Sequence, residues 1–324
     1  MYHPFCETSG TCLRLPGSGG VIGSRPCEII DGNGLRAEGP RARRMNQPGP
    51  APLLSAEQVL FGYDAVSRLY PHWPSLSAWR AWEFAAYQRY RLPEPVLDIG
   101  CGDGLFFQIL WPGVVDAVGV DTDPAAVEAA RRLGVYREVH RATADELPVP
   151  AVSFASAFAN CSLEHMDHLP KVLAGVQRVL RPGGVFLLSV VTDKFLEWTT
   201  LPMLLEWMSE PARARALQAE YQAYHHVVNP LPPKSWVEVL ENTGFEVLEH
   251  TPILPEMSSR LFLLIDQLWH TRAASGEVGE TLQARVRALP RFPQAFGDIL
   301  RAVLQMERDW TEGSGAVFWA RRGA

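Results

Sequence analysis

The stretch Val96-Leu-Asp-Ile-Gly-Cys-Gly-Asp-Gly104 decides the fold of this chain. Its first four residues, apolar apart from Asp98, predict a short buried strand. The glycines at 100, 102 and 104 then form a GxGxG pattern, which predicts a tight turn where a ligand can approach the main chain. The helix that follows would direct its free N–H groups into the same space. Asp98 precedes the first glycine by two residues and suits a ligand that carries a positive charge, such as a sulfonium or an ammonium.

Strands and helices alternate outward from this turn, which predicts an α/β fold with a parallel sheet. The clearest helix spans 169–180, where apolar residues recur at helical spacing. Further helices are expected at 75–90, 105–111, 123–134 and 236–242, and strands at 96–99, 114–120, 135–140, 154–159, 185–191, 245–248 and 316–320. We therefore expect a doubly wound, mostly parallel, Rossmann-like sheet.

Two segments, 193–233 and 251–313, interrupt the alternation and are rich in aromatic residues. The second is expected to form two helices, and both are expected to act as a helical lid over a hydrophobic substrate cavity. Residues 1–52 are rich in Gly, Pro, Ser and Arg and are expected to be disordered, with Met45 as an alternative start. The folded domain would then cover 53–324.

Composition excludes several classes of function. The net charge of −6 and the absence of a basic run in the expected domain argue against a nucleic-acid partner. The five cysteines are irregularly spaced, which fits neither a disulfide framework nor a zinc site and favours a reduced, cytoplasmic setting. No apolar stretch approaches 18 residues, so no transmembrane segment is expected. The apolar run at 261–265 allows contact with a membrane surface or with a second subunit in a homodimer.

Polar residues follow three further strands and suit parts of a nucleoside ligand. Asp121 ends the second expected strand and can accept both hydroxyls of a ribose, because Asp123 already fills the role of helix cap. Asp145, beside Glu146, follows the third strand and can accept an adenine amino group. Asn160 ends the fourth strand, where a backbone carbonyl could take an ammonium.

Five motifs in this order resemble the class I S-adenosylmethionine-dependent methyltransferases, especially the small-molecule enzymes of quinone pathways. They are VLDIGCGDG at 96–104, VGVDTDP at 118–124, ADELPV at 144–149, NCSLEHM at 160–166 and VLRPGGVFLLSV at 179–190. The resemblance implies a seven-stranded sheet with an antiparallel last strand, and S-adenosylmethionine bound across the strand ends. The candidate cofactor-binding residues are Asp98, Gly100, Cys101, Gly102, Gly104, Asp121, Thr122, Asp145, Glu146 and Asn160.

Some quinone O-methyltransferases hold a divalent metal with a Glu-x-x-Glu-His run after the fourth strand. Here Cys161 stands at the first position, before Glu164 and His165, so no metal is expected. The candidate catalytic bases are His165 and the pair His225 and His226. Each also has a structural interpretation, since the family's histidine after strand four is often structural and the pair could form a polar hinge.

We therefore expect an S-adenosylmethionine-dependent methyltransferase that acts on a small, lipophilic or aromatic metabolite, with O-methylation favoured. The alternative is a protein or RNA acceptor, although 160–163 lacks the Asn/Asp-Pro-Pro-aromatic run of nucleic-acid N-methyltransferases. A binding module without catalysis conflicts with the complete cofactor motifs. A nicotinamide dehydrogenase would need the GxGxxG pattern, which is missing here.

Overall fold

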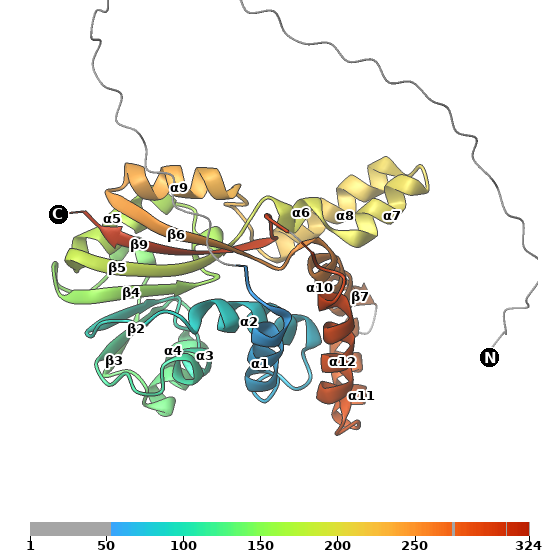
Figure 1. The fold of residues 1–324 in the computed structure, drawn as a ribbon, viewed down its shortest axis with the longest axis horizontal. Helices are drawn as coiled ribbons and strands as arrows, with labels where there is room; N and C mark the ends of the chain where they lie inside the picture. Colours follow the sequence, from blue (N-terminus) through green and yellow to red (C-terminus); the bar gives the residue numbers. More distant parts are fainter. Residues whose placement is uncertain (1–52, 274–275, 309, 324) are drawn as a thin grey trace, which may run out of the picture. The chain divides into compact units, whose positions relative to one another are not determined.

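The computed structural model describes residues 53–273, 276–308 and 310–323. The expected disorder of 1–52 lies outside these residues. The main sheet has seven strands in the order β3-β2-β1-β4-β5-β9-β6 (Figure 1). Its strands are β1 (Val96–Ile99), β2 (Ala117–Asp121), β3 (Glu138–Arg141), β4 (Phe154–Asn160), β5 (Leu180–Val191), β6 (Phe245–Ile253) and β9 (Gly315–Arg322).

Strand β9 runs antiparallel to both β5 and β6, while β1 to β5 pair in parallel. The doubly wound, mostly parallel sheet with an antiparallel last strand is thus confirmed. Strand β1 lies between β2 and β4, and all four of its residues are buried because helices cover both of its faces.

The glycine turn after β1 forms as the sequence predicts. Gly100, Gly102 and Gly104 have φ values of 73°, 54° and 79°, in the left-handed region that favours glycine. A Cβ on Gly100 would lie 2.7 Å from Cβ of Ser162, and one on Gly104 would lie 2.8 Å from the Tyr136 ring. The chain then enters α3 (Leu105–Leu110) with Gly104 as its N-cap residue.

Helices cover both faces of the sheet, which makes two apolar core layers (Figure 1). On one face lie α5 (Leu169–Val179) and α9 (Pro233–Asn242). The other face is covered by α2 (Pro74–Tyr87), α3 and α4 (Pro124–Leu133), and α1 (Ala56–Val66) packs against α2. Asp123 caps α4 as expected, since its side chain accepts a hydrogen bond of 2.8 Å from the Ala125 N–H.

Several strand boundaries differ from the sequence predictions. Strand β2 begins at Ala117 rather than at 114, because the N–H groups of Val115 and Asp116 donate to the Glu94 carboxylate instead of to a neighbouring strand. Strand β3 begins at Glu138 rather than at 135, and β5 begins at Leu180 rather than at 185. Strand β6 continues to Ile253 because it pairs with β9 along its whole length. The first residues of the expected insertion 251–313 therefore belong to the sheet.

The first insertion forms α6 (Lys194–Glu197), α7 (Thr200–Trp207) and α8 (Pro211–Tyr224). The second forms α10 (Glu256–Trp269), α11 (Val278–Arg287) and α12 (Phe292–Leu304), with a short hairpin of β7 (Arg272–Ala273) and β8 (Gly276–Glu277). The expectation of two helices in the second insertion was wrong. Pro290 separates α11 from α12, because the residue before a proline disfavours helical backbone.

The apolar run at 261–265 lies in α10, which packs against α2, α7, α11 and α12. Phe262 and Leu263 are buried there, so much of this run serves the core of the domain. Contact of this helix with a membrane or a second subunit stays a prediction. Among the described residues, no helix combines the length and the apolar character that crossing a membrane requires.

Candidate active site

A first cavity of about 550 Å³ lies at the carboxyl ends of β1, β2, β3 and β4. Four of the candidate cofactor-binding residues line it: Gly100, Asp121, Thr122 and Asp145. These residues come from separate loops that meet at one edge of the sheet because the strands are parallel. Ligands of open α/β sheets bind at this edge.

The carboxylate of Asp121 is held in place by backbone N–H groups. Its Oδ2 accepts a hydrogen bond of 2.8 Å from Gly102, and its Oδ1 accepts one of 2.9 Å from Asp123. Each carboxylate oxygen has a second lone pair. Asp121 therefore keeps an acceptor site on each oxygen while its orientation is fixed.

Asp145 lies in a short 3₁₀ helix, Ala144–Glu146, on another wall of the first cavity. Its Oδ2 lies 3.0 Å from the Lys171 Nζ, which also lies 3.2 Å from Oε1 of Glu146. Hydrogen bonds from Thr143 and Lys171 hold the pKa of Asp145 below its usual value. Asp145 is thus a charged acceptor at the cavity wall, whereas Glu146 is exposed and does not line the cavity.

The remaining cofactor candidates also lie off the cavity wall: Asp98, Cys101, Gly102, Gly104 and Asn160. Asp98 is buried beneath the turn and accepts a hydrogen bond from the Tyr136 hydroxyl. Burial raises the pKa of Asp98 to about 7, the Tyr136 bond opposes this rise, and the charge of Asp121 adds to it. Contact of Asp98 with a positively charged ligand stays a prediction.

Asn160 belongs to a buried polar cluster that the sequence did not reveal. Its side-chain amide lies 2.9 Å from the Tyr87 hydroxyl. With the amide nitrogen facing Tyr87 and Glu83, the amide oxygen accepts a hydrogen bond from the Arg80 guanidinium. Arg80 and Glu83 form an ion pair of 2.6 Å, and the Ser189 hydroxyl donates to Glu83 at 2.7 Å. This cluster fixes the end of β4 against α2.

A second cavity of about 300 Å³ adjoins the first, and Cys161 and His165 line both. Its apolar walls include Trp79 from α2, Phe195 from the first insertion and Phe262 from the second. Its ionisable side chains are Arg80, Cys161, Glu164, His165, His225, Asp266 and His270. An apolar cavity with a few polar groups is typical of a site for a small molecule.

Glu164 belongs to the wall of the second cavity and carries a buried carboxyl group. The residue is 0% exposed, and neither carboxyl oxygen has a hydrogen-bond partner among the described residues. Burial raises the pKa of Glu164 to about 8, and the charge of Glu83 adds to this rise. A buried carboxyl without partners is costly, so this group favours a ligand that carries a hydrogen-bond donor or acceptor.

His165 stands at the junction of the two cavities. Its Nδ1 lies 3.2 Å from the backbone carbonyl of His226, and because a carbonyl can only accept, Nδ1 carries the hydrogen. Burial lowers the pKa of His165, so the imidazole is neutral at neutral pH and its Nε2 has a free lone pair. That Nε2 lies 3.9 Å from Oε1 of Glu164.

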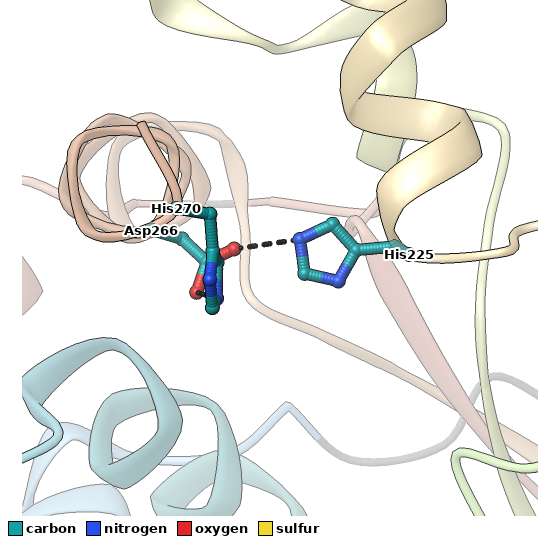
Figure 2. A group of neighbouring side chains, drawn as sticks. All are labelled: His225, Asp266 and His270. Carbon is teal, nitrogen blue, oxygen red and sulfur yellow. Dashed lines mark ion pairs between the residues drawn. The ribbon is translucent and has the colours of Figure 1, made fainter. Parts of the chain in front are cut away.

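The adjacent histidines His225 and His226 point to different surroundings. His225 follows the last residue of α8 and lines the second cavity, where its Nε2 lies 3.0 Å from Oδ2 of Asp266 (Figure 2). His226 is exposed, has a φ of 48° and does not line the cavity. Of the adjacent histidines, only His225 therefore lies at the second cavity, and a catalytic role for either residue stays a prediction.

Asp266 and His270 were not singled out from the sequence. They lie one helical turn apart at the end of α10, and both line the second cavity. Their spacing of four residues places them on one side of the helix, so the sequence already indicated that they could act together. The partner, His225, lies 41 residues before Asp266 in the sequence and meets it only because α8 packs near α10.

A family model described as a methyltransferase domain matches residues 78–250, which includes β1 to β5 and most of β6. The chain belongs to this methyltransferase family. It is an S-adenosylmethionine-dependent methyltransferase, as its resemblance predicted.

Curated relatives are similar at low identity. Demethylmenaquinone methyltransferase of Symbiobacterium thermophilum is 24% identical over 212 residues, which cover 58% of this chain and 82% of the relative. Trans-aconitate 2-methyltransferase of Acidovorax ebreus is 28% identical over 264 residues, 72% of this chain and 97% of the relative. The mitochondrial 2-methoxy-6-polyprenyl-1,4-benzoquinol methylase of Drosophila melanogaster is 28% identical over 138 residues, 38% of this chain and 45% of the relative. Several other relatives are also matched over less than half of their length.

The first cavity fits the methyl donor on its own chemistry. Ser162 leaves no room for a side chain at Gly100, so a ligand at the end of β1 meets the main chain there. Asp121 offers fixed acceptors at the end of β2, which suit vicinal hydroxyls. The negative charges of Asp121 and Asp145 suit a ligand that carries positive charge.

Proposed function

We propose that this methyltransferase transfers the methyl group to an oxygen of a small, lipophilic or aromatic metabolite bound in the second cavity. The observation that carries the proposal is the junction of the two cavities at Cys161 and His165. A donor in the first cavity and an acceptor in the second would meet there. The apolar walls and the volume of about 300 Å³ favour a small molecule over the alternative of a protein or RNA acceptor.

In this proposal the donor is held by residues at the strand ends. Asp121 accepts the ribose hydroxyls, Thr122 and Asp145 line the adenosine part, and Gly100 provides close access to the main chain. When bound, S-adenosylmethionine supplies a methyl group on a positively charged sulfur, which leaves as a neutral thioether. The protein then has to align the acceptor and exclude water.

The acceptor is proposed to be bound and activated by neighbouring side chains. Glu164 pairs with a polar group of the acceptor, since its carboxyl lacks any other partner among the described residues. Its raised pKa of about 8 keeps it neutral at pH 7, so it can donate as well as accept a hydrogen bond. His165 accepts the proton that the acceptor hydroxyl loses as its oxygen takes the methyl group, because Nε2 has a free lone pair at the junction.

Methyl-labelled S-adenosylmethionine tests the substrate class. The full chain is incubated with a lipophilic metabolite extract, a panel of phenols and hydroxyquinones, and separate protein and RNA fractions. Label is expected in a small molecule, as a methyl ether. Label that appears only in protein or RNA would contradict the proposal.

The variant His165→Gln tests the proton acceptor. Turnover is expected to fall roughly 10²-fold or more while cofactor affinity stays within a factor of a few, since His165 acts on the acceptor. His140→Gln is the matched control, because His140 also lies near a carboxylate, 3.3 Å from Oε2 of Glu138, but on the far strand β3. Wild-type turnover in His165→Gln would remove this residue from the mechanism.

A further inference from the structure

We propose that His225, Asp266 and His270 bind a divalent transition-metal ion in the wall of the second cavity. Each residue offers one ligand atom, and these atoms all lie within 4.8 Å of one another. Figure 2 shows the His225 imidazole reaching from the end of α8 toward the other two side chains on α10. Two imidazole nitrogens and one carboxylate oxygen form a donor set that suits zinc and iron(II).

The spacing of the donor atoms is close to that of a bound site. Nε2 of His225 lies 3.0 Å from Oδ2 of Asp266, and Nε2 of His270 lies 3.7 Å from Oδ1 of Asp266. Metal–ligand bonds of about 2.0–2.2 Å place neighbouring donor atoms roughly 3–3.5 Å apart. On binding, the three ligand atoms would draw together to this spacing from positions that all lie within 4.8 Å of one another.

Nε2 of His225 has no hydrogen-bond partner among the described residues. Its Nε2 is buried and forms no hydrogen bond of acceptable geometry among the described residues, although it lies so close to Asp266. An imidazole nitrogen that is buried without a hydrogen bond is unfavourable. A cation between this nitrogen and the carboxylate would satisfy both groups.

Outer residues hold the ligands in a metal-binding orientation. The Tyr221 hydroxyl donates a hydrogen bond of 2.7 Å to Oδ2 of Asp266. Nδ1 of His270 lies 3.5 Å from Oε2 of Glu277, which directs Nε2 toward Asp266. Ligating histidines commonly pair their second nitrogen with a carboxylate, and ligating carboxylates are commonly hydrogen-bonded. Both features are present here.

The position of the site indicates what the ion would do. All three ligands line the second cavity, and three protein ligands leave at least one open coordination position. The ion would therefore bind an oxygen of the acceptor, which restricts the substrate to molecules with a hydroxyl, carbonyl or carboxylate group at that end. Coordination would also lower the pKa of a bound hydroxyl and favour its loss of a proton. This role, unlike the metal site itself, rests on the proposed function.

Direct metal titration tests the site without any methyl transfer. The full chain is stripped with EDTA and titrated with Co²⁺, whose visible absorption reports its ligands, and then with Zn²⁺ as competitor. We expect saturable binding of one ion per chain and a rise in melting temperature, because the ion binds only the folded state. No saturable binding by the folded protein would overturn the proposal.

Matched variants locate the ion. Asp266→Asn and His270→Gln are each expected to weaken binding by roughly 100-fold or more, since loss of an outer residue alone often costs 10–100-fold. His140→Gln should bind like the wild type. If Asp266→Asn fails to fold, as circular dichroism would show, His270→Gln still decides the matter, because His270 lies at the end of α10 and is partly exposed. Unchanged affinity in the folded variants would place the ion elsewhere and overturn the assignment.

A separate comparison tests the role of the ion toward the acceptor. Methyl transfer by the stripped enzyme is measured before and after Zn²⁺ is restored, with cofactor affinity as a second readout. We expect a loss of transfer that Zn²⁺ reverses, without change in cofactor affinity. Equal transfer in both states would reject acceptor ligation while the titration still supports the metal site. Absence of any small-molecule product would reject the proposed function and leave the titration unaffected.

Discussion

The backbone N–H of Gly102 donates a hydrogen bond of 2.8 Å to Oδ2 of Asp121. This bond joins the glycine turn after β1 to the end of β2, so two motifs separated in sequence form one structural unit. Gly102 does not line the first cavity, but it orients a carboxylate that does. The glycine turn thus acts on the site partly through Asp121.

Replacing Asp121 should weaken cofactor binding. The variant Asp121→Ala removes both ribose acceptors, and two hydrogen bonds to a charged group at roughly 1.5–3 kcal/mol each predict a loss of about 100-fold or more. Asp121→Asn keeps one oxygen acceptor and should bind with intermediate affinity. Calorimetric titration with S-adenosylmethionine measures both. Wild-type affinity in Asp121→Ala would mean that the ribose binds elsewhere.

The glycines of the turn should differ in their tolerance of a side chain. A Cβ on Gly102 meets no atom within 4 Å, so Gly102→Ala should cost about 1–3 kcal/mol through its left-handed backbone alone. Gly100→Ala has a similar φ and also brings Cβ to 2.7 Å from Ser162, so its loss of stability should be larger. Chemical denaturation of the two variants checks this order. Equal losses would show that Ser162 moves aside without cost.

Glu164 should make stability depend on pH. Its pKa is raised from the usual 4.5 to about 8, so between these values the folded state holds a proton that the unfolded state has lost. Its contribution to stability is therefore complete below pH 4.5 and falls as the pH rises toward 8. Glu164→Gln cannot ionise, and its free energy of unfolding should fall less steeply over this range. Denaturation curves at several pH values compare the two proteins, and parallel slopes would show that Glu164 has an ordinary pKa.

The sequence predicted the sheet because its signals were local. The apolar strands, the glycines at 100, 102 and 104, and the Asp123 cap each depend on neighbouring residues, and the structure forms all of them. Strand ends were less accurate because pairing decides them. The extension of β6 to Ile253 depends on β9, more than 60 residues away, and cannot be read from β6 alone.

The candidate site was only partly predictable for the same reason. Asp121 ends β2 and Asp145 lies in the short helix soon after β3, so the order of the strands sufficed to place both at one cavity. The second cavity is built from α2 and both insertions, whose packing leaves no local pattern in the sequence. The meeting of His225 with Asp266 depends wholly on this packing. Even the different directions of His225 and His226 follow from one backbone turn at His226.

Because of the backbone turn at His226, the two adjacent histidines should differ in their effect on turnover. His225 lines the second cavity beside Asp266, whereas the side chain of its neighbour His226 is exposed. His225→Gln should therefore lower kcat/KM for the acceptor by roughly tenfold or more, and His226→Gln should lower it clearly less. Cofactor affinity should hold in both, because S-adenosylmethionine is assigned to the strand-end residues. Steady-state kinetics with calorimetry on both variants provide the comparison. A larger loss in His226→Gln would show that the second histidine, not the first, faces the acceptor when the enzyme turns over.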